Sequence, residues 1–257
     1  MKAYEAAGST YLTRRLPVVV RVDGRAFHTW VRRAGYERPF DFRLTERMVA
    51  AAHHLMQEMS NAVFVHTSSD EISVVMADDR ALNTEPWFGN GLQKVVSVAA
   101  SIATMAFNRS GDPGVEGTWH TDAMFDARAF TLPHAEVTNY LLWRQRDAER
   151  NCVSAHAQDI FGHKRVQGVS TSGLVEMLAS AGVSVEAMPL WQRRGVCIRR
   201  LLDAVSGRLI TVQDSEPPRI SDDRDYVEDT LLHRAPNNIV TTELVRRMAE
   251  QNREWSR

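Results

Sequence analysis

The order of apolar segments in the first half of the chain limits the folds open to it. Strand-like and helix-like periodicities alternate over six segments, which are residues 18–22, 44–59, 62–66, 71–76, 92–108 and 127–132. The first, third, fourth and sixth predict strands, and the other two predict helices. Residues 23–41 are predicted to be a loop whose length indicates a function. This βαββαβ order is typical of a ferredoxin-like α+β fold, an antiparallel sheet with helices. The third strand then lies between the first two.

This topology brings two acidic segments together. Asp23-Gly24 follows the first strand, and Asp70-Glu71 stands where the second strand turns into the third. Because the third strand runs antiparallel to the first, the end of one lies beside the start of the other. An isolated Asp-Gly is most often only a turn, and a Ser-Asp-Glu in a hairpin turn is most often solvated. Their predicted proximity favours a shared site.

Paired carboxylates of this kind are typical of metal-dependent phosphoryl transfer. We predict that Asp23, Asp70 and Glu71 are catalytic, and that Asp23, Asp70 and the Gly24 carbonyl bind two Mg²⁺ ions. The following backbone amides would cradle a triphosphate. Arg21 would be a second phosphate clamp, and Lys94 would bring a cation and a helix start to the same phosphates. The nucleotide-binding residues predicted from these arguments are therefore Arg21, Gly24, Arg25, Ala26, Phe27, His28 and Lys94.

The second half of the chain is predicted to be mainly helical. It contains one or two helices over 135–161, a helix over 174–181 capped by Ser170, a β-hairpin over 193–213, and later helices over 222–233 and 241–255. We expect a palm-like catalytic region over residues 1–133 and a helical and hairpin region over residues 134–257 packed on it. The two are expected to form one integrated domain.

Composition narrows the class of protein. The chain has 257 residues, of which 44% are hydrophobic and 25% are charged, as in an ordinary globular protein. No apolar run approaches the roughly 18 residues of a membrane span, and the N-terminus lacks a signal-peptide core. Cys152 and Cys197 are not spaced as a metal or redox motif. We therefore expect a cytoplasmic protein with reduced thiols and no membrane partner.

Basic residues recur as pairs although the net charge is only −1. A single arginine pair is most often a solvated surface feature. Their number leaves room for a local basic surface that could bind RNA. The predicted RNA-binding residues within these groups are Arg144, Arg150, Lys164 and Arg165.

Several ordered motifs resemble those of the tRNA-histidine guanylyltransferase family, and the resemblance covers about residues 4–226. The motifs are RVDGRAFH at 21–28, SDEIS at 69–73, WFG at 87–89 with Lys94 and Ser97, WRQ at 143–145 with Asp147 and Asn151, and the later positions His163, Lys164, Gly168, Ser170, Thr171, Arg194, Gly195 and Cys197. The resemblance is specific because these motifs agree in order and spacing.

The resemblance implies a polymerase-palm-like domain that adds nucleotides to the 5′ end of tRNA, in the 3′-to-5′ direction. A 5′-monophosphate would first be activated with ATP or GTP, and the 3′-hydroxyl of an incoming nucleoside triphosphate would then attack it. By resemblance, Asp23, the Gly24 carbonyl and Asp70 bind two Mg²⁺ ions with support from Glu71. The resemblance also implies that Phe27, His28, Ser69 and Lys94 hold the nucleotide and its phosphates, and that Arg128, which follows Phe125-Asp126, faces RNA. The family also implies a homotetramer.

Two departures bear on the branch of the family. Ser68 stands where the family usually has Gln. Glu149-Arg150-Asn151-Cys152 replaces a His-Ile-Asn-Asn run that is associated in eukaryotic members with adding guanosine to histidine tRNA. The sequence therefore favours the bacterial and archaeal branch, which repairs 5′-truncated tRNA by copying the opposite strand of the acceptor stem. The alternative is addition of a 5′ guanosine to histidine tRNA.

Two other functions remain open. A nucleotide cyclase uses a similar palm and two metals, but the long helical part with its basic pairs is unexplained by that activity. A catalytically silent RNA-binding module on the same frame would show aromatic side chains on its central strands. The first and third strands carry Val18, Val19, Val20 and Val74 instead.

Overall fold

The structure is a computed structural model that describes residues 1–111, 122–203 and 208–231. The strands are β1 (Val18–Gly24), β2 (Ala62–Ser68), β3 (Glu71–Met76), β4 (Phe125–Thr131), β5 (Val196–Leu202) and β6 (Leu209–Asp214). The helices are α1 (Lys2–Ala7), α2 (Phe27–Arg33), α3 (Phe42–Glu58), η1 (Trp87–Asn90), α4 (Leu92–Arg109), α5 (His134–Phe161), α6 (His163–Val166), α7 (Thr171–Ser180), η3 (Val185–Ala187), α8 (Leu190–Arg194) and α9 (Asp225–Leu231).

The strands form a six-stranded sheet in the order β4-β1-β3-β2-β5-β6. Every neighbouring pair is antiparallel, and β4 and β6 are the outer strands. The predicted α+β fold is confirmed, including the place of β3 between β1 and β2. The C-terminal hairpin extends the same sheet, because β5 pairs with β2.

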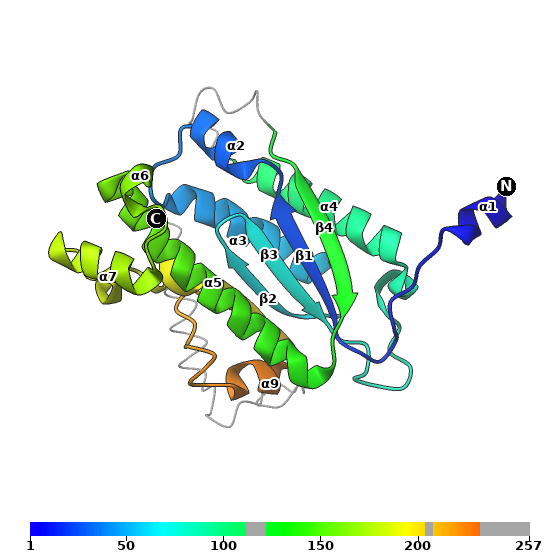
Figure 1. Cartoon of the computed structure of the whole chain (residues 1–257). Helices are drawn as coiled ribbons and strands as arrows, with labels where there is room; N and C mark the ends of the chain where they lie inside the picture. Colours follow the sequence, from blue (N-terminus) through cyan, green and yellow to red (C-terminus); the bar gives the residue numbers. More distant parts are fainter. Residues whose placement is uncertain (112–121, 204–207, 232–257) are drawn as a thin grey trace.

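Helices cover the sheet on both faces (Figure 1). Strand β1 is apolar on both sides, and alternate residues reach opposite layers. Val18, Val20 and Val22 pack with α3 and α4 in one cluster. Val19 packs in a second cluster with residues of α5 and α9, including Leu141. Strand β1, which carries Asp23 near its end, is therefore fixed between two packed layers.

Helix α5 crosses one face of the sheet as a single element of 28 residues. Its C-terminal half leaves the sheet and forms a third apolar cluster with α6 and α7, in which Cys152, Ala157, Leu174 and Leu178 are buried. Ser170 caps α7, as predicted, because its side chain accepts a hydrogen bond from the Gly173 amide.

Some sequence predictions need correction. Residues 23–41 were expected to be a loop, but they contain helix α2, and Asp23 and Gly24 belong to β1. The predicted helix at 222–233 begins three residues later, at Asp225, as α9, and its last two residues, 232–233, lie outside the described residues. The predicted helix at 241–255 and the turn at Ser206-Gly207 lie outside the described residues.

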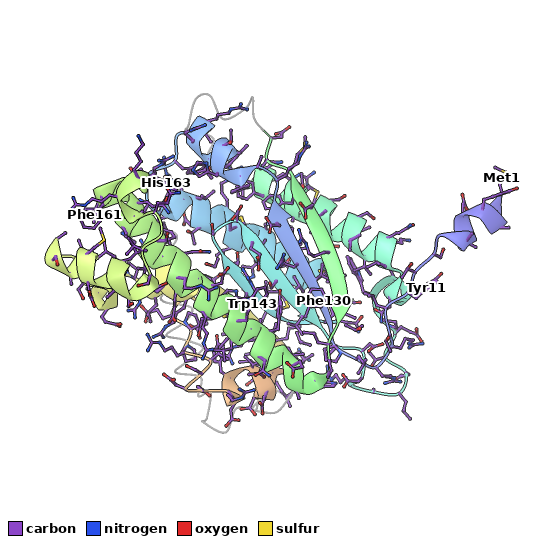
Figure 2. The ribbon with its side chains drawn as sticks, viewed as in Figure 1. Met1, Tyr11, Phe130, Trp143, Phe161 and His163 are labelled. Carbon is purple, nitrogen blue, oxygen red and sulfur yellow. The ribbon has the colours of Figure 1, made fainter. Side chains whose placement is uncertain are left out.

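The N-terminal helix α1 projects away from the rest of the molecule (Figure 1), and none of its residues is buried. Figure 2 shows Met1 at the far end of this projection and Tyr11 at the start of the chain's return to the body. Among the described residues, no helix has both the length and the apolar character needed to cross a membrane.

Candidate active site

Asp23 and Asp70 meet at one end of the sheet. Asp23 lies near the end of β1, directly opposite Glu71 on β3. Asp70 lies in the turn before Glu71, and its carbonyl oxygen accepts a hydrogen bond of 3.0 Å from the Gly24 amide. The prediction that these two acidic segments lie side by side is therefore confirmed.

Asp70 is held in place by the turn between β2 and β3, in which it lies. Ser69 has a φ angle of 56°, and its hydroxyl donates a 3.1 Å hydrogen bond to Asp70 Oδ1. Burial raises the pKa of Asp70, and the charge of Asp23 raises it further, against hydrogen bonds from its own backbone amide and Ser69. A cation placed between the two carboxylates would relieve this penalty.

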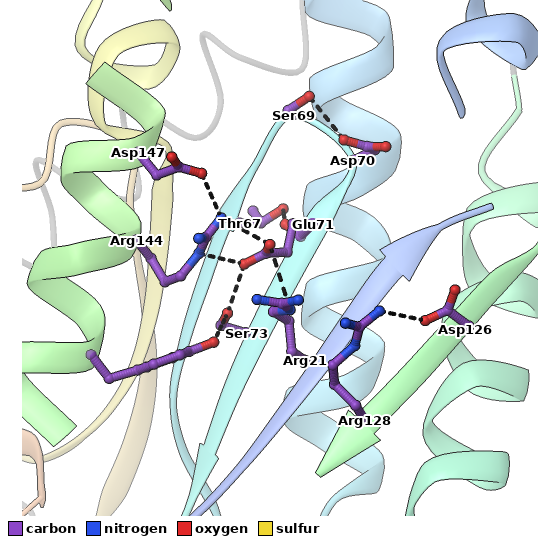
Figure 3. Close-up of polar contacts among 11 residues, drawn as sticks. Arg21, Thr67, Ser69, Asp70, Glu71, Ser73, Asp126, Arg128, Arg144 and Asp147 are labelled. Carbon is purple, nitrogen blue, oxygen red and sulfur yellow. Dashed lines mark hydrogen bonds and ion pairs between the residues drawn. The ribbon is translucent and has the colours of Figure 1, made fainter. Parts of the chain in front are cut away.

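Glu71 was predicted to support the metals, but the structure gives it another set of partners. Figure 3 shows it pointing toward α5, where both of its oxygens contact Arg144, at 2.7 and 2.9 Å. Arg21 lies 3.7 Å away, and Ser73 donates a hydrogen bond of 3.2 Å. Burial raises the pKa of Glu71, and the two arginines oppose that shift. Glu71 thus anchors arginines beside the site.

Arg21 and Arg128 form a basic pair next to Asp23. They are directly opposite each other on β1 and β4. Their side chains lie on the same face of the sheet as Glu71, which is the face that Arg144 contacts from α5 (Figure 3). Arg128 is half-exposed and contacts Asp126 at 3.3 Å. Like charges on opposed residues are unfavourable without an anion between them. This pair is therefore suited to bind phosphate.

Asp126 is a carboxylate that sequence reasoning missed. It pairs with Asp23 on the other side of β1, so Glu71, Asp23 and Asp126 form one row across three strands. The motif Phe125-Asp126 was noticed in the sequence only as the context of Arg128. Pairing of β4 with β1, which the βαββαβ order implies, is the signal that could have identified it.

The turn after Asp23 is very close-packed. A Cβ atom on Gly24 would lie 2.3 Å from Cδ2 of Phe27. Ala26 takes the left-handed conformation, with φ 51° and ψ 35°, at the start of α2. Such strain in a residue other than glycine costs on the order of 1–3 kcal/mol and is concentrated at functional sites.

This turn leaves only part of its backbone for a ligand. The Arg25 amide donates to the Met124 carbonyl at 2.8 Å, so the prediction that it cradles a triphosphate is wrong. Within the described part of the chain, the amides of Ala26, Phe27 and His28 have no protein acceptor. They include the first amides of α2, which an intrahelical bond cannot satisfy.

Phe27 has a core position in addition to its predicted role. Its ring stacks on Trp30 with the centroids 5.0 Å apart and contacts Phe107 and Phe125 at 5.4 and 5.5 Å. Only 4% of its surface is exposed. The ring therefore holds α2 against the sheet, and its backbone remains beside the site.

A cavity of about 540 Å³ opens beside Asp70, between α2, the start of α3 and the C-terminal part of α5. His28, Ser69 and Asp70 line it. The other residues that line the cavity were not predicted individually, although the length of segment 23–41 had indicated a function for that segment. These include Arg32, Glu37, Arg38, Phe40, Asp41, Gln158, Asp159, His163 and Trp191.

A family model described as tRNAHis guanylyltransferase (Thg1) matches residues 1–133. This chain belongs to the Thg1 family. The tRNA(His) guanylyltransferase of Schizosaccharomyces pombe is 33% identical over 54% of this chain and 53% of its own length. A probable tRNA(His) guanylyltransferase of Homo sapiens is 31% identical over 52% of this chain and 44% of its own length. The chain thus spans about half the length of these curated relatives.

Solved structures of the Thg1 family match more of the chain. A bacterial Thg1-like protein in complex with ATP superposes with a TM-score of 0.82 at 39% identity, covering 90% of this chain and 97% of that one. A bacterial Thg1-like protein in complex with GTP gives 0.75 at 37% identity, covering 90% and 96%. The tRNA(His) guanylyltransferase of Saccharomyces cerevisiae, at 19% identity and a TM-score of 0.65, supports the fold.

The prediction for Lys94 is wrong within this Thg1-family chain. Strand β3 starts beside Asp23 and ends opposite Val18, so α4 begins at the far end of the sheet. The Tyr11–Gly91 bridge also places the start of α4 there. The Lys94 ammonium lies 4.6 Å from the centre of the Phe88 ring. It does not face the phosphate side of Asp23 and Asp70.

The predicted RNA-binding residues fall into two groups. Arg144 is largely buried and tied to Glu71 and Asp147, so it is not a free RNA contact. Arg150 is half-exposed and contacts Asp147 at 2.5 Å. Lys164 and Arg165 are exposed on α6, next to the cavity residue His163.

Proposed function

We propose that this protein adds nucleotides to the 5′ end of tRNA in the 3′-to-5′ direction. The junction of Asp23 and Asp70 beside a 540 Å³ cavity carries this proposal. A cavity of that volume accommodates a ligand the size of a nucleotide. The bacterial Thg1-like proteins bound to ATP and GTP support a nucleoside triphosphate as the ligand.

The carboxylates of Asp23 and Asp70 and the Gly24 carbonyl would hold two Mg²⁺ ions. The donor set fits, because all three groups supply hard oxygen ligands and Asp70 is half-buried beside a second negative charge. When bound, Mg²⁺ activates an attacking hydroxyl and neutralises a leaving phosphate. Glu71 is outside this set because its oxygens bind Arg144.

The chain's own groups would orient both substrates. The free amides of Ala26, Phe27 and His28 suit the phosphates of a nucleotide whose base lies in the cavity. Arg21 and Arg128 suit the 5′ phosphate of the RNA. In this proposal an oxygen of the RNA 5′-monophosphate attacks the α-phosphate of ATP or GTP and pyrophosphate leaves. The 3′-hydroxyl of the incoming triphosphate then loses its proton and attacks the activated 5′ phosphate, and AMP or GMP leaves.

We propose templated repair of 5′-truncated tRNA as the specific activity. The residues Glu149-Arg150-Asn151-Cys152 support it, because Cys152 is fully buried against Met188 and cannot act as a polar contact to a histidine tRNA. The near-complete match to bacterial Thg1-like proteins also supports it. Addition of a 5′ guanosine to histidine tRNA is the second candidate, because the curated relatives are named for that activity.

The test uses purified protein with Mg²⁺, ATP and each labelled nucleoside triphosphate. One reaction contains a tRNA that lacks its first nucleotide, and a second contains full-length histidine tRNA. Templated repair predicts addition of the nucleotide that pairs with the opposite strand in the first reaction. Guanosine addition only to the full-length histidine tRNA would favour the second candidate. A cyclic nucleotide formed without RNA would instead indicate a cyclase.

Asp23→Asn and Asp70→Asn are expected to reduce addition by at least about 10³-fold and leave the circular dichroism spectrum unchanged. Glu85→Gln is a matched control, because this exposed carboxylate lies in the loop that contacts Arg14, at the opposite end of β1. Turnover near that of the wild type in either Asp variant would contradict the two-metal assignment.

We also propose a homotetramer, on the family resemblance alone, and a cytoplasmic location, on the two free cysteines. Light scattering coupled to size-exclusion chromatography measures the mass in solution. A mass near the 29.0 kDa of one chain would contradict the tetramer.

A further inference from the structure

A second depression lies along α5 and shares no lining residue with the cavity beside Asp70. Its volume is about 360 Å³, and we call it the arginine groove. It is formed by α5, the start of α7, η3, α8 and the segment around residue 219. Four arginines and two glutamates supply all of its charged walls, which are Arg146, Arg150, Arg193, Arg219, Glu149 and Glu186. We propose that this groove binds backbone phosphates of the tRNA.

The positive charge of the groove is only partly neutralised. Arg193, with a side chain that is 6% exposed, is held by Glu186 at 2.6 Å. Glu149 contacts Arg219 at 3.2 Å. Arg146 is exposed and makes no ion pair or hydrogen bond with the residues that the structure describes. Arg146 is thus a cation available for a phosphate.

A further arginine lies close to the groove. Burial lowers the pKa of Arg194, and the positive charges of Arg193 and Arg219 lower it further. Glu149 lies 3.8 Å from Arg194 as well as contacting Arg219, so one glutamate faces two guanidinium groups. An incoming anion would reduce this repulsion.

The start of α7 adds backbone donors to the same groove. Thr171 is the first residue of this ten-residue helix and lines the groove. Ser170 caps the amide of Gly173, so the two preceding amides of the first turn remain without a cap. Helix N-termini favour anions through these amides and the helix dipole. The groove therefore combines two independent sources of anion affinity.

The walls favour an RNA backbone over a free nucleotide. The apolar part consists of Val153, Val175 and Val185, and no aromatic side chain is among the lining residues to stack on a base. The cavity beside Asp70 differs, because Phe27, Phe40 and Trp191 line it. A site with cations and helix amides but no stacking surface recognises phosphates without reading bases.

The groove is close to the active site along one helix. Arg144 contacts Glu71, and Arg146 and Arg150 follow it within two turns of α5. Six residues of helix span about 9 Å. An RNA strand with its 5′ end at Asp23 could therefore pass over α5 and reach the groove. This inference rests on the proposed function, because it assumes that tRNA is the substrate.

The test measures tRNA binding by fluorescence anisotropy over a series of salt concentrations. Arg146→Glu should weaken binding by about tenfold, and Arg146→Ala should reduce the salt slope by about one phosphate contact. Thr171→Asp should also weaken binding severalfold. An acidic residue in the first turn stabilises a helix, so unfolding cannot account for that loss.

Arg80→Glu is the matched control. Arg80 is exposed, lies in the loop after β3 at the opposite end of the sheet, and undergoes the same charge change. Equal tRNA affinity and salt slope in Arg146→Glu and Arg80→Glu would overturn the inference. So would a loss in Arg146→Glu of ATP binding and not of tRNA binding.

The two proposals fail in different ways. If the wild type binds tRNA but adds no nucleotide, the proposed function fails and the binding comparison still decides the role of the groove. If the wild type extends truncated tRNA and Arg146→Glu binds it as tightly as Arg80→Glu does, only the groove assignment fails.

Discussion

Single residues at the end of β1 have little steric freedom. Gly24 accepts the Phe27 ring where any other residue would place its Cβ, 2.3 Å from a ring carbon. The same ring belongs to the aromatic cluster that fixes α2. The glycine of the Asp-Gly pair is therefore required for packing as well as for access of a ligand to its carbonyl.

We expect Gly24→Ala to lower the free energy of unfolding by about 2–4 kcal/mol. The added methyl group must displace a buried ring or the backbone, and both are costly in a close-packed core. Chemical denaturation measures the loss. Gly8→Ala, at a glycine with open space around it, should change stability little. Equal effects in the two variants would contradict the steric argument.

His66 predicts a pH dependence of stability. It is buried, its Nε2 donates to the Arg194 carbonyl at 2.8 Å, and burial lowers its pKa to about 4, with a further lowering from Arg144. The unfolded state takes up a proton near pH 6.5 and the folded state does not. The contribution of His66 to the free energy of unfolding is therefore fully present above about pH 6.5. It is lost as the pH drops toward 4, and the loss is up to ~3 kcal/mol.

The measurement is the unfolding free energy of wild type and His66→Gln between pH 7.5 and 4.5. Glutamine keeps a donor for the Arg194 carbonyl and does not titrate, so its curve should be flatter than that of the wild type. His54→Gln, at an exposed position, should retain the wild-type slope. Parallel curves for wild type and His66→Gln would exclude His66 as the cause.

Among the elements, α3 and α4 are joined by a buried cation. Arg47 on α3 donates two hydrogen bonds, of 3.1 and 2.9 Å, to the Phe107 carbonyl in the last turn of α4. It also donates to the Tyr36 hydroxyl at 2.6 Å and lies 4.1 Å from the centre of the Phe107 ring. Arg47 thereby donates to a carbonyl that has no intrahelical partner at the end of α4. The ring of the same residue, Phe107, belongs to the aromatic cluster that packs against α2.

We expect Arg47→Met to reduce the unfolding free energy by roughly 3 kcal/mol. Methionine fills similar space but removes the donor of the Tyr36 hydroxyl and two of the three donors of the Phe107 carbonyl, which keeps only the Ser110 hydroxyl at 2.9 Å. Denaturant unfolding provides the comparison, and Arg109→Met is the control, because Arg109 is exposed in the same last turn of α4. A loss no larger than that of Arg109→Met would show that the burial of Arg47 adds no stability.

The sequence predicted regular elements better than the partners of charged residues. Strand β3 has the predicted bounds because four of its six residues are apolar, three of these are β-branched, and turn-forming residues precede it. Helix α2 was missed because it has seven residues and begins at a left-handed alanine, which no propensity favours. The burial of Arg47 and the Glu71–Arg144 contact depend on packing between segments far apart in sequence.

At the scale of the whole molecule, topology decided which site predictions held. The βαββαβ order correctly placed Asp23 beside Asp70, because both lie at adjoining strand ends. The same order explains why the prediction for Lys94 is wrong, because β3, the strand before α4, runs from Asp23 to the far end of the sheet. The cavity walls could not be predicted, because they come from four separate segments, among them the turn at Ser69 and helix α8.

The N-terminal helix is expected to add nothing to the stability of the single chain. No residue of α1 is buried, and Tyr4 is 81% exposed. Removal of residues 1–7 should therefore leave the unfolding free energy of the monomeric chain within about 0.5 kcal/mol of wild type. Removal of residues 1–12 is the comparison, because Leu12 packs on the core and bonds to Asn90. Only the longer deletion should destabilise the protein.

The position of β4 as an outer strand has a consequence for solubility. Among the described residues its outer edge has no partner strand, and such an edge offers unpaired amides and carbonyls to which another polypeptide could add, the usual start of sheet-mediated aggregation. Asp126 and Arg128 put exposed charges of both signs on this edge, where they oppose such pairing. The polar groups beside Asp23 therefore protect an open sheet margin from self-association while leaving it accessible from solvent.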